Sequence, residues 1–140
     1  MPINILVVDD SKSMRSVIKK VLLISGFDLG DLYEAGNGQE ALEVLQDNWV
    51  DLVLTDVHMP GMGGIEFLKA LKSDEVLKKV PVVLITTEGR EEKVQEAFTL
   101  GANGYLKKPF TPEQIKETLT KVVGEEYAAS PEEDFDGCDF

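Results

Sequence analysis

Hydrophobic positions along this chain alternate between short continuous runs and longer stretches in which they recur every three or four residues. Short apolar runs bounded by polar residues are typical of buried strands, and the three-to-four spacing is typical of amphipathic helices. We expect strands near residues 4–9, 31–35, 50–56, 81–86 and 104–107. Strands and helices that alternate in this way predict an α/β fold with a parallel sheet covered on both faces.

Five helices are expected between and after these strands. Their apolar positions are Met14, Val17, Ile18, Val21 and Leu22 in the first, Ala41, Val44 and Leu45 in the second, Ile65, Phe67, Leu68 and Leu71 in the third, Val94, Ala97 and Phe98 in the fourth, and Ile115, Leu119, Val122 and Val123 in the fifth. Gly26 and Gly101 are suited to end the first and fourth helices, because glycine adopts the left-handed backbone common at helix ends.

Capping signals mark the starts of two of these helices. Asn37 with Glu40 three residues later has the pattern of a capping box, in which each side chain accepts a hydrogen bond from the backbone of the other residue. Thr111 and Gln114 repeat the pattern, and Pro112 stands at the first helical position, where a missing N–H removes no helical bond.

Composition and charge narrow the class of protein. No apolar run approaches the length of a membrane span, the N-terminus lacks a signal-peptide pattern, and Cys138 is the single cysteine, so we expect a cytoplasmic protein without membrane insertion. The net charge of −12 argues against nucleic-acid binding. Seven acids and no Lys or Arg lie in residues 125–140.

The apolar periodicity stops after Gly124, which predicts a domain over residues 1–124 and an acidic, disordered tail over 125–140. Two interpretations of the tail remain open. It either solvates the protein or serves as an acidic-aromatic docking segment around Phe135 and Phe140, for another protein or for a Lys-containing surface of the body.

Residues suited to phosphate chemistry follow the predicted strands. Asp9 and Asp10 follow the first, Asp56 ends the third, Thr86 ends the fourth, and Lys108 follows the fifth. These side chains should converge, because the carboxyl ends of parallel strands meet at one edge, where ligands bind. An aspartate can attack phosphorus, which makes Asp56 the candidate nucleophile.

The remaining polar groups can offset the negative charge of such a reaction. Carboxylates at Asp9, Asp10 and Asp56 repel each other unless a cation lies between them, and carboxylate oxygens suit Mg²⁺. Lys108 would neutralise one phosphoryl oxygen, and the Thr86 hydroxyl could donate to another. The strand ends therefore predict a metal-assisted phosphate acceptor.

Four segments of the chain resemble the receiver domain of two-component response regulators, and among these the stand-alone regulators of chemotaxis. They are Val-Val-Asp-Asp-Ser at 7–11, Asp-Val-His-Met-Pro-Gly at 56–61, Ile-Thr-Thr-Glu at 85–88, and the stretch from glycine to phenylalanine at 101–110. The resemblance covers residues 3–124. It implies a flavodoxin-like, doubly wound five-stranded parallel sheet in the order 2-1-3-4-5 with five helices.

The resemblance also implies roles for the residues at the strand ends. Asp56 would accept phosphate from a phosphohistidine on a sensor histidine kinase. Asp10, Asp56 and the backbone carbonyl of His58 would bind Mg²⁺ directly, and Asp9 would act mainly through water. The protein would be a signalling switch that assists its own phosphorylation and dephosphorylation, not an enzyme.

Switching is implied for a pair of residues on neighbouring strands. The Thr86 hydroxyl would move toward the phosphoryl group, and the ring of Tyr105 would turn inward behind it. Partner affinity would then change on the face made by the fourth helix, the fifth strand and the fifth helix. The bond between Lys108 and Pro109 is cis in this family, and proline makes a cis bond accessible at about 1 kcal/mol.

The implied output is control of the flagellar motor switch in chemotaxis. A stand-alone receiver in a phosphorelay or another two-component circuit is the alternative. Val57 stands where the chemotaxis regulator of enteric bacteria has a tryptophan, and His58 occupies a position often held by asparagine. His58 leaves the phosphoryl lifetime open, and Trp49, which lies before the strand, should report metal binding poorly.

Two functions of other classes have less support. A phosphatase with an aspartyl-phosphate intermediate would need a second acid two residues after Asp56, where His58 stands instead. A flavodoxin-like cofactor binder needs a phosphate-binding loop rich in Ser, Thr or Gly after the first strand. Asp9 and Asp10 would repel that phosphate.

Overall fold

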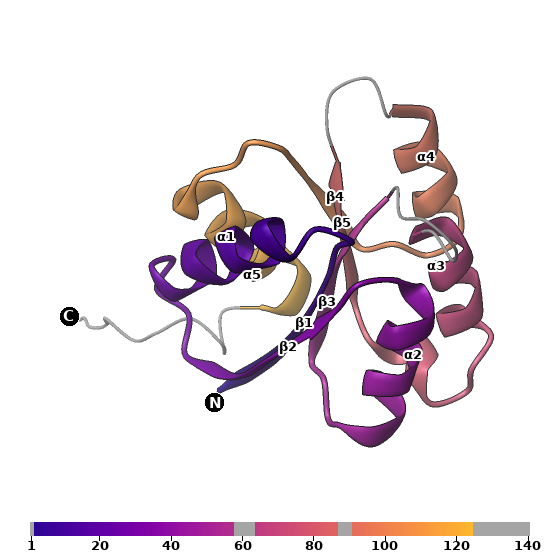
Figure 1. The fold of residues 1–140 in the computed structure, drawn as a ribbon. Coiled ribbons are helices and arrows are strands. Elements are labelled where there is room, and N and C mark those ends of the chain that lie inside the picture. Colours follow the sequence, from indigo (N-terminus) through magenta and orange to yellow (C-terminus); the bar gives the residue numbers. More distant parts are fainter. Residues whose placement is uncertain (1, 58–63, 87–90, 125–140) are drawn as a thin grey trace.

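Five parallel strands form one sheet in the computed structural model, which describes residues 2–57, 64–86 and 91–124 (Figure 1). The strands are β1 (Ile3–Val8), β2 (Leu29–Ala35), β3 (Leu52–Asp56), β4 (Val82–Thr86) and β5 (Gly104–Lys107). Their order is β2-β1-β3-β4-β5, and every neighbouring pair is parallel. The predicted flavodoxin-like topology is confirmed.

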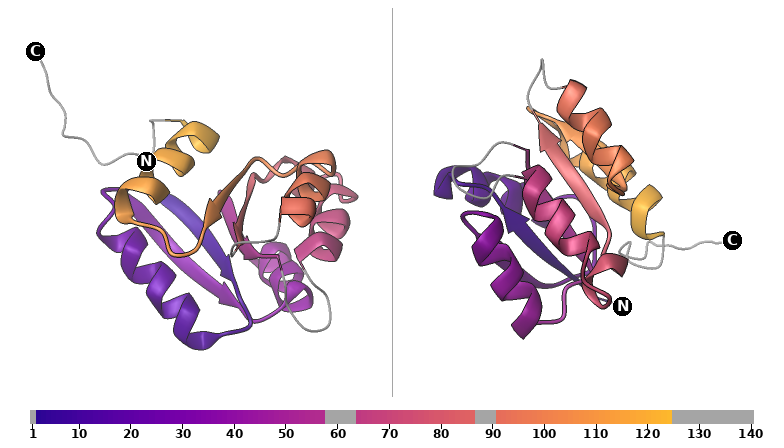
Figure 2. Two further views of the ribbon diagram at one scale, coloured as in Figure 1. Left: turned by 90° about the horizontal axis from the view of Figure 1, so that it is seen from above. Right: turned by 90° about the vertical axis from the view of Figure 1, so that its right-hand side faces the viewer.

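Helices cover both faces of this sheet. They are α1 (Lys12–Leu23), α2 (Gly38–Asp47), α3 (Gly64–Lys72), α4 (Glu91–Thr99) and α5 (Pro112–Val123), together with a 3₁₀ helix, η1 (Leu77–Lys79), that the sequence did not predict. Figures 1 and 2 show α1 and α5 on one face and α2, α3 and α4 on the other. Within the described ranges, no helix is long and apolar enough to cross a membrane.

Alternate residues of the central strands enter two separate hydrophobic cores. Leu6 and Leu84 belong to the core beneath α2, α3 and α4, whereas Ile5 and Ile85 belong to the core beneath α1 and α5, and all four are fully buried. Both faces of these strands are therefore apolar, so the strands appear in the sequence as continuous runs.

β2 and β3 begin at other residues than expected, and Asn4 makes polar contacts near both starts. β2 begins at Leu29, earlier than predicted, and its pairing with β1 is irregular between Ile3 and Ile5. There the side chain of Asn4 accepts a 2.8 Å hydrogen bond from the backbone N–H of Asp31. β3 begins at Leu52, later than predicted, although the N–H of Asp51 already donates to the backbone of Asn4.

Three helix predictions need correction. Val17 has the helical spacing of the apolar positions in α1, yet it is 49% exposed. That helix ends at Leu23, and Gly26 takes its left-handed conformation (φ +95°) in the turn beyond. The Asn37 side chain accepts from the backbone N–H of Glu40, as a capping box requires. The Glu40 side chain, however, accepts from the N–H of Gly36 at 2.8 Å, so the capping box is half formed.

The remaining helix ends agree with the prediction. Thr111 and Gln114 form the complete capping box of α5, with hydrogen bonds of 2.9 and 3.1 Å, and Pro112 stands at its first position. Gly101 follows α4 with a φ of +111°. The predicted acidic tail at 125–140 lies outside the described residues.

Candidate functional site

Three aspartates meet at the carboxyl ends of the two central strands. Asp9 and Asp10 follow β1, Asp56 ends β3, and these strands pair directly, with Val8 opposite Thr55. One carboxylate oxygen from each aspartate lies within 4.8 Å of the others. Asp9 is buried, Asp56 is partly buried and Asp10 is exposed. The structure thus brings together the three acids that the sequence singled out.

Asp9 is only 2% exposed, and both of its carboxylate oxygens accept hydrogen bonds. The N–H of Ser11 donates to Oδ1 at 2.9 Å, and Nζ of Lys108 donates to Oδ2 at 3.3 Å. A buried charge needs such partners, because the protein interior solvates it poorly. These contacts fix the orientation of the buried carboxylate.

Lys108 brings positive charge into the cluster from the fifth strand. Its backbone N–H donates to the carbonyl of Thr86 at 2.7 Å, and the bond between Lys108 and Pro109 is cis, as expected. Nζ lies 3.7 Å from Oδ2 of Asp56 in addition to its contact with Asp9. The ammonium therefore stands between the buried carboxylate and the candidate nucleophile.

Thr86 and Tyr105 lie on neighbouring strands with different exposure. Thr86 ends β4 and is buried, whereas Tyr105 on β5 is 49% exposed. The Tyr105 ring packs edge-to-face on Phe98 of α4, with ring centroids 6.1 Å apart at 84°. The aromatic pair joins β5 to α4 on the outside of the molecule.

Arg15 and Glu34 support the acidic loop and were missed as site residues in the sequence. Nη1 of Arg15 donates to the backbone carbonyl of Asp9 at 2.6 Å, and its Nε lies 2.9 Å from Oε1 of Glu34. Lys19 pairs with the other Glu34 oxygen at 2.6 Å. Hydrogen bonds from Lys19 and Arg15 lower the pKa of Glu34.

The helical spacing of Arg15 and Lys19 was the available signal for this contact. They are four residues apart and so lie on one face of α1, but only the fold shows that this face meets β2. His58, whose backbone carbonyl was a predicted metal ligand, lies outside the described residues.

The geometry suits a hard cation and an anionic group together. Three carboxylates offer oxygen ligands of the kind that Mg²⁺ prefers, and their mutual repulsion falls when a dication binds. The Lys108 ammonium can pair with a further anion beside Asp56. The arrangement can therefore hold a metal ion and stabilise a phosphoryl group.

Known proteins share this sequence and fold. The family profile of the response regulator receiver domain matches residues 5–120, a range that includes Asp9, Asp10, Asp56 and Lys108. The chemotaxis protein CheY-3 of Vibrio cholerae is 44% identical over 119 residues, which make up 85% of this chain and 90% of that protein. The chemotaxis protein CheY of Pseudomonas aeruginosa is 42% identical over 119 residues, 85% of this chain and 94% of that protein.

Solved structures give the same result. The chemotaxis protein CheY4 of Vibrio cholerae superposes with a TM-score of 0.78 at 38% identity, covering 88% of this chain and 100% of that one. A response regulator receiver domain protein from Clostridium thermocellum superposes with a TM-score of 0.77 at 27% identity, covering 89% and 96%.

Proposed function

The chain belongs to the response regulator receiver domain family, and we propose that it is a single-domain response regulator phosphorylated on Asp56 that acts in chemotaxis. One observation carries the assignment of the site. Nζ of Lys108 lies 3.3 Å from Asp9 and 3.7 Å from Asp56, beside three carboxylates whose oxygens lie within 4.8 Å of one another. The chemotaxis assignment is supported by relatives that are named as chemotaxis proteins.

The proposed cofactor is Mg²⁺, held directly by Asp10 and Asp56 with the backbone carbonyl of His58, and by Asp9 through water. The difference in exposure supports this division. Both oxygens of buried Asp9 already accept hydrogen bonds, whereas Asp10 is exposed. When bound, the dication would offset the charge of the phosphoryl oxygens.

The proposed phosphoryl donor is a phosphohistidine of a sensor histidine kinase. A carboxylate oxygen of Asp56 forms the new P–O bond as the P–N bond of the donor breaks, and the electron pair of that bond returns to the imidazole. Lys108 neutralises a phosphoryl oxygen, and the Thr86 hydroxyl donates to another. The residues thus position the group and balance its charge, and the product is a modified switch.

The proposed output surface comprises α4, β5 and α5, with the flagellar motor switch as its target. Tyr105 on β5 is half exposed and contacts Phe98 of α4, so a movement of the Tyr105 ring would alter this surface. Thr86 ends the neighbouring strand β4, which gives the phosphoryl group a short route to Tyr105. A phosphorelay remains the alternative output.

Binding to a purified flagellar motor switch protein tests the proposed output. We expect phosphorylation to raise the affinity about tenfold, which is within the usual range of allosteric coupling. The variant Tyr105→Ala should lose most of this gain, whereas Val17→Ala, at an exposed position on α1, should keep it. Equal binding in both states, with rapid phosphoryl exchange to a histidine phosphotransfer protein, would favour the phosphorelay.

A further inference from the structure

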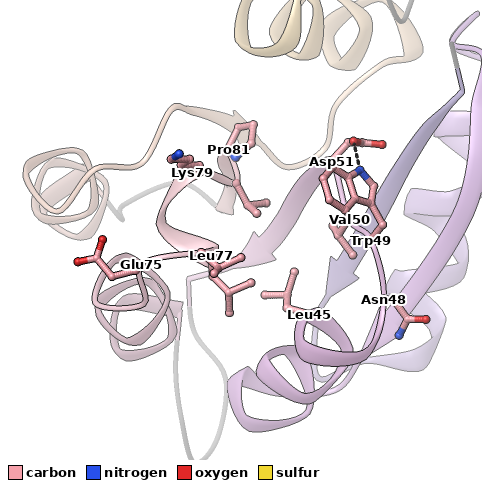
Figure 3. Close-up of a pocket in the computed structure, with 11 residues that line it drawn as sticks. Leu45, Asn48, Trp49, Val50, Asp51, Glu75, Leu77, Lys79 and Pro81 are labelled. Atoms are coloured by element: carbon pink, nitrogen blue, oxygen red, sulfur yellow. Dashed lines mark hydrogen bonds between the residues drawn. The ribbon is translucent and has the colours of Figure 1, made fainter.

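A pocket of about 470 Å³ opens where β3 and β4 begin, at the opposite end of the sheet from the three aspartates (Figure 3). Leu45 of α2, Leu77 of η1, and the residues Val50, Val80 and Pro81 before the two strands give it an apolar wall. Its volume is in the range of pockets that bind small molecules.

Two large hydrophobic side chains on the pocket are unusually exposed to water. Trp49 is 78% exposed and Val76 is 77% exposed, the highest values for large hydrophobic residues in the described part of the chain. The indole N–H donates to Oδ1 of Asp51 at 2.9 Å, which holds the ring beside the pocket (Figure 3). These two apolar side chains are therefore available to contact an occupant of the pocket.

The polar residues of the pocket include one lysine that can meet a negatively charged group of an occupant. Glu75 pairs with Lys78 at 2.7 Å, and the two carboxylate oxygens of Asp51 accept from Trp49 and from the backbone of Asn4. Both acids that line the pocket therefore have partners already. Lys79 is exposed at the edge of the pocket, where it can meet a carboxylate of the occupant.

The chain itself contains a segment with this chemistry. Residues 125–140 hold seven acids and no Lys or Arg, and Phe135 stands between Asp134 and Asp136. A phenyl ring flanked by two carboxylates matches an apolar wall with a lysine at its edge.

The end of α5 places this segment within reach of the pocket. A methyl of Val122 lies 3.2 Å from where a Cβ would stand on Gly104, so α5 ends near the start of β5. The pocket opens where β3 and β4 start, at the same end of the sheet but on the face covered by α2, so the segment must pass around that end of the sheet. Phe135 is the eleventh residue after Gly124, and eleven residue steps can span up to about 36 Å, whereas adjacent strands are only about 5 Å apart.

We propose that residues 125–140 bind back onto this pocket, with the Phe135 ring against Trp49 and the apolar wall and the flanking aspartates near Lys79. Tethering favours such a contact, because a short linker gives an effective concentration in the millimolar range. A segment that binds with millimolar affinity as a free peptide would then occupy the pocket about half of the time. The inference does not depend on the proposed phosphorylation chemistry.

Trp49 is the only tryptophan of the chain and therefore reports directly on the pocket. The experiment measures acrylamide quenching of its fluorescence in the full chain. Phe135→Ala should make Trp49 about twofold more accessible to quencher, as expected if the contact is half occupied in the parent. Lys79→Ala should act in the same direction, whereas Phe140→Ala and the exposed Lys121→Ala should leave the quenching unchanged.

Equal quenching in the parent and in Phe135→Ala would overturn the proposal. So would protection of Trp49 that is lost on dilution, because that result would assign the pocket to a second copy of the chain. Phosphorylation by acetyl phosphate is measured on the same samples. It should be the same in the parent and in Phe135→Ala, which separates a failure of this proposal from a failure of the proposed function.

Discussion

The guanidinium of Arg15 donates a 2.6 Å hydrogen bond to the backbone carbonyl oxygen of Asp9. Arg15 is also paired with Glu34 on β2, so the loop that carries Asp9 and Asp10 is tied to the strand next to β1. This contact holds the loop without using either carboxylate of the acid pair, which leaves both side chains for the site.

Arg15→Met should weaken Mg²⁺ binding about tenfold, because loss of a charge-assisted hydrogen bond costs about 1.5 kcal/mol and frees the acidic loop. Lys19→Met is the matched control, since it removes one positive charge and one ion pair with Glu34 but no contact with Asp9. Removal of a positive charge should by itself slightly raise the Mg²⁺ affinity of both variants. Titration calorimetry that finds equal Mg²⁺ affinity in the two variants would contradict this role of Arg15.

The ion pairs of Glu34 should make stability depend on pH. Hydrogen bonds from Lys19 and Arg15 hold its pKa below the usual 4.5 in the folded state. The contribution of Glu34 is therefore present above its unfolded pKa and is lost as the pH falls through the lower folded value. We expect Glu34→Gln to lower the free energy of unfolding by about 1 kcal/mol or less at neutral pH.

Thermal melts over a range of pH test this prediction. The difference between the parent and Glu34→Gln should disappear at a pH below the folded pKa of Glu34. Glu43→Gln, an exposed change on α2, supplies the baseline. A difference that stays constant down to that acid pH would show that Glu34 acts by packing and not by charge.

Gly64 should tolerate no side chain, because α3 begins directly against the backbone of β3. A Cβ at Gly64 would overlap the carbonyl oxygen of Asp56 and would lie 3.1 Å from that of Val57. We expect Gly64→Ala to lower the free energy of unfolding by about 1–3 kcal/mol, as overpacking does elsewhere. In the control Gly36→Ala, the nearest atom is the movable side-chain oxygen of Glu40 at 3.3 Å. Urea denaturation that gives both variants the same stability would refute this prediction.

Trp49 should report Mg²⁺ binding poorly. It precedes β3, whereas Asp56 ends that strand, and seven residues of extended chain span about 23 Å. The indole is bonded to Asp51, at the start of the strand. A fluorescence titration should therefore show little change up to saturating Mg²⁺, in the parent as in Asp10→Asn. A large quench in the parent alone would contradict the expected insensitivity.

The sequence predicted the fold and the acid cluster because both follow from where strands end. Asp9 and Asp10 come directly after one buried apolar run, Asp56 follows another across Thr55, and parallel pairing then brings them together. Lys108 was predicted in the same way from the end of β5. The strand order, in contrast, came from the resemblance to a family, since apolar runs carry no information about their neighbours.

Other features depend on tertiary packing that local patterns do not encode. The role of Arg15 requires the face of α1 to meet β2, and the start of β2 depends on the side chain of Asn4. Val17 fits the helical spacing but lies at the edge of the buried stripe, so spacing alone does not predict its exposure. The pocket beside Trp49 is lined in part by η1, a single turn without an apolar period.

The most direct test of the central claim is the intact mass of the protein after incubation with acetyl phosphate and Mg²⁺. We predict one phosphoryl adduct in the parent, none in Asp56→Asn, and none when Mg²⁺ is removed by a chelator. Lys108→Met should reduce the adduct strongly, because it removes the ammonium that lies 3.7 Å from Asp56. A parent protein that gains no adduct, or an adduct of equal yield in Asp56→Asn, would contradict the assignment of Asp56 as the phosphoacceptor.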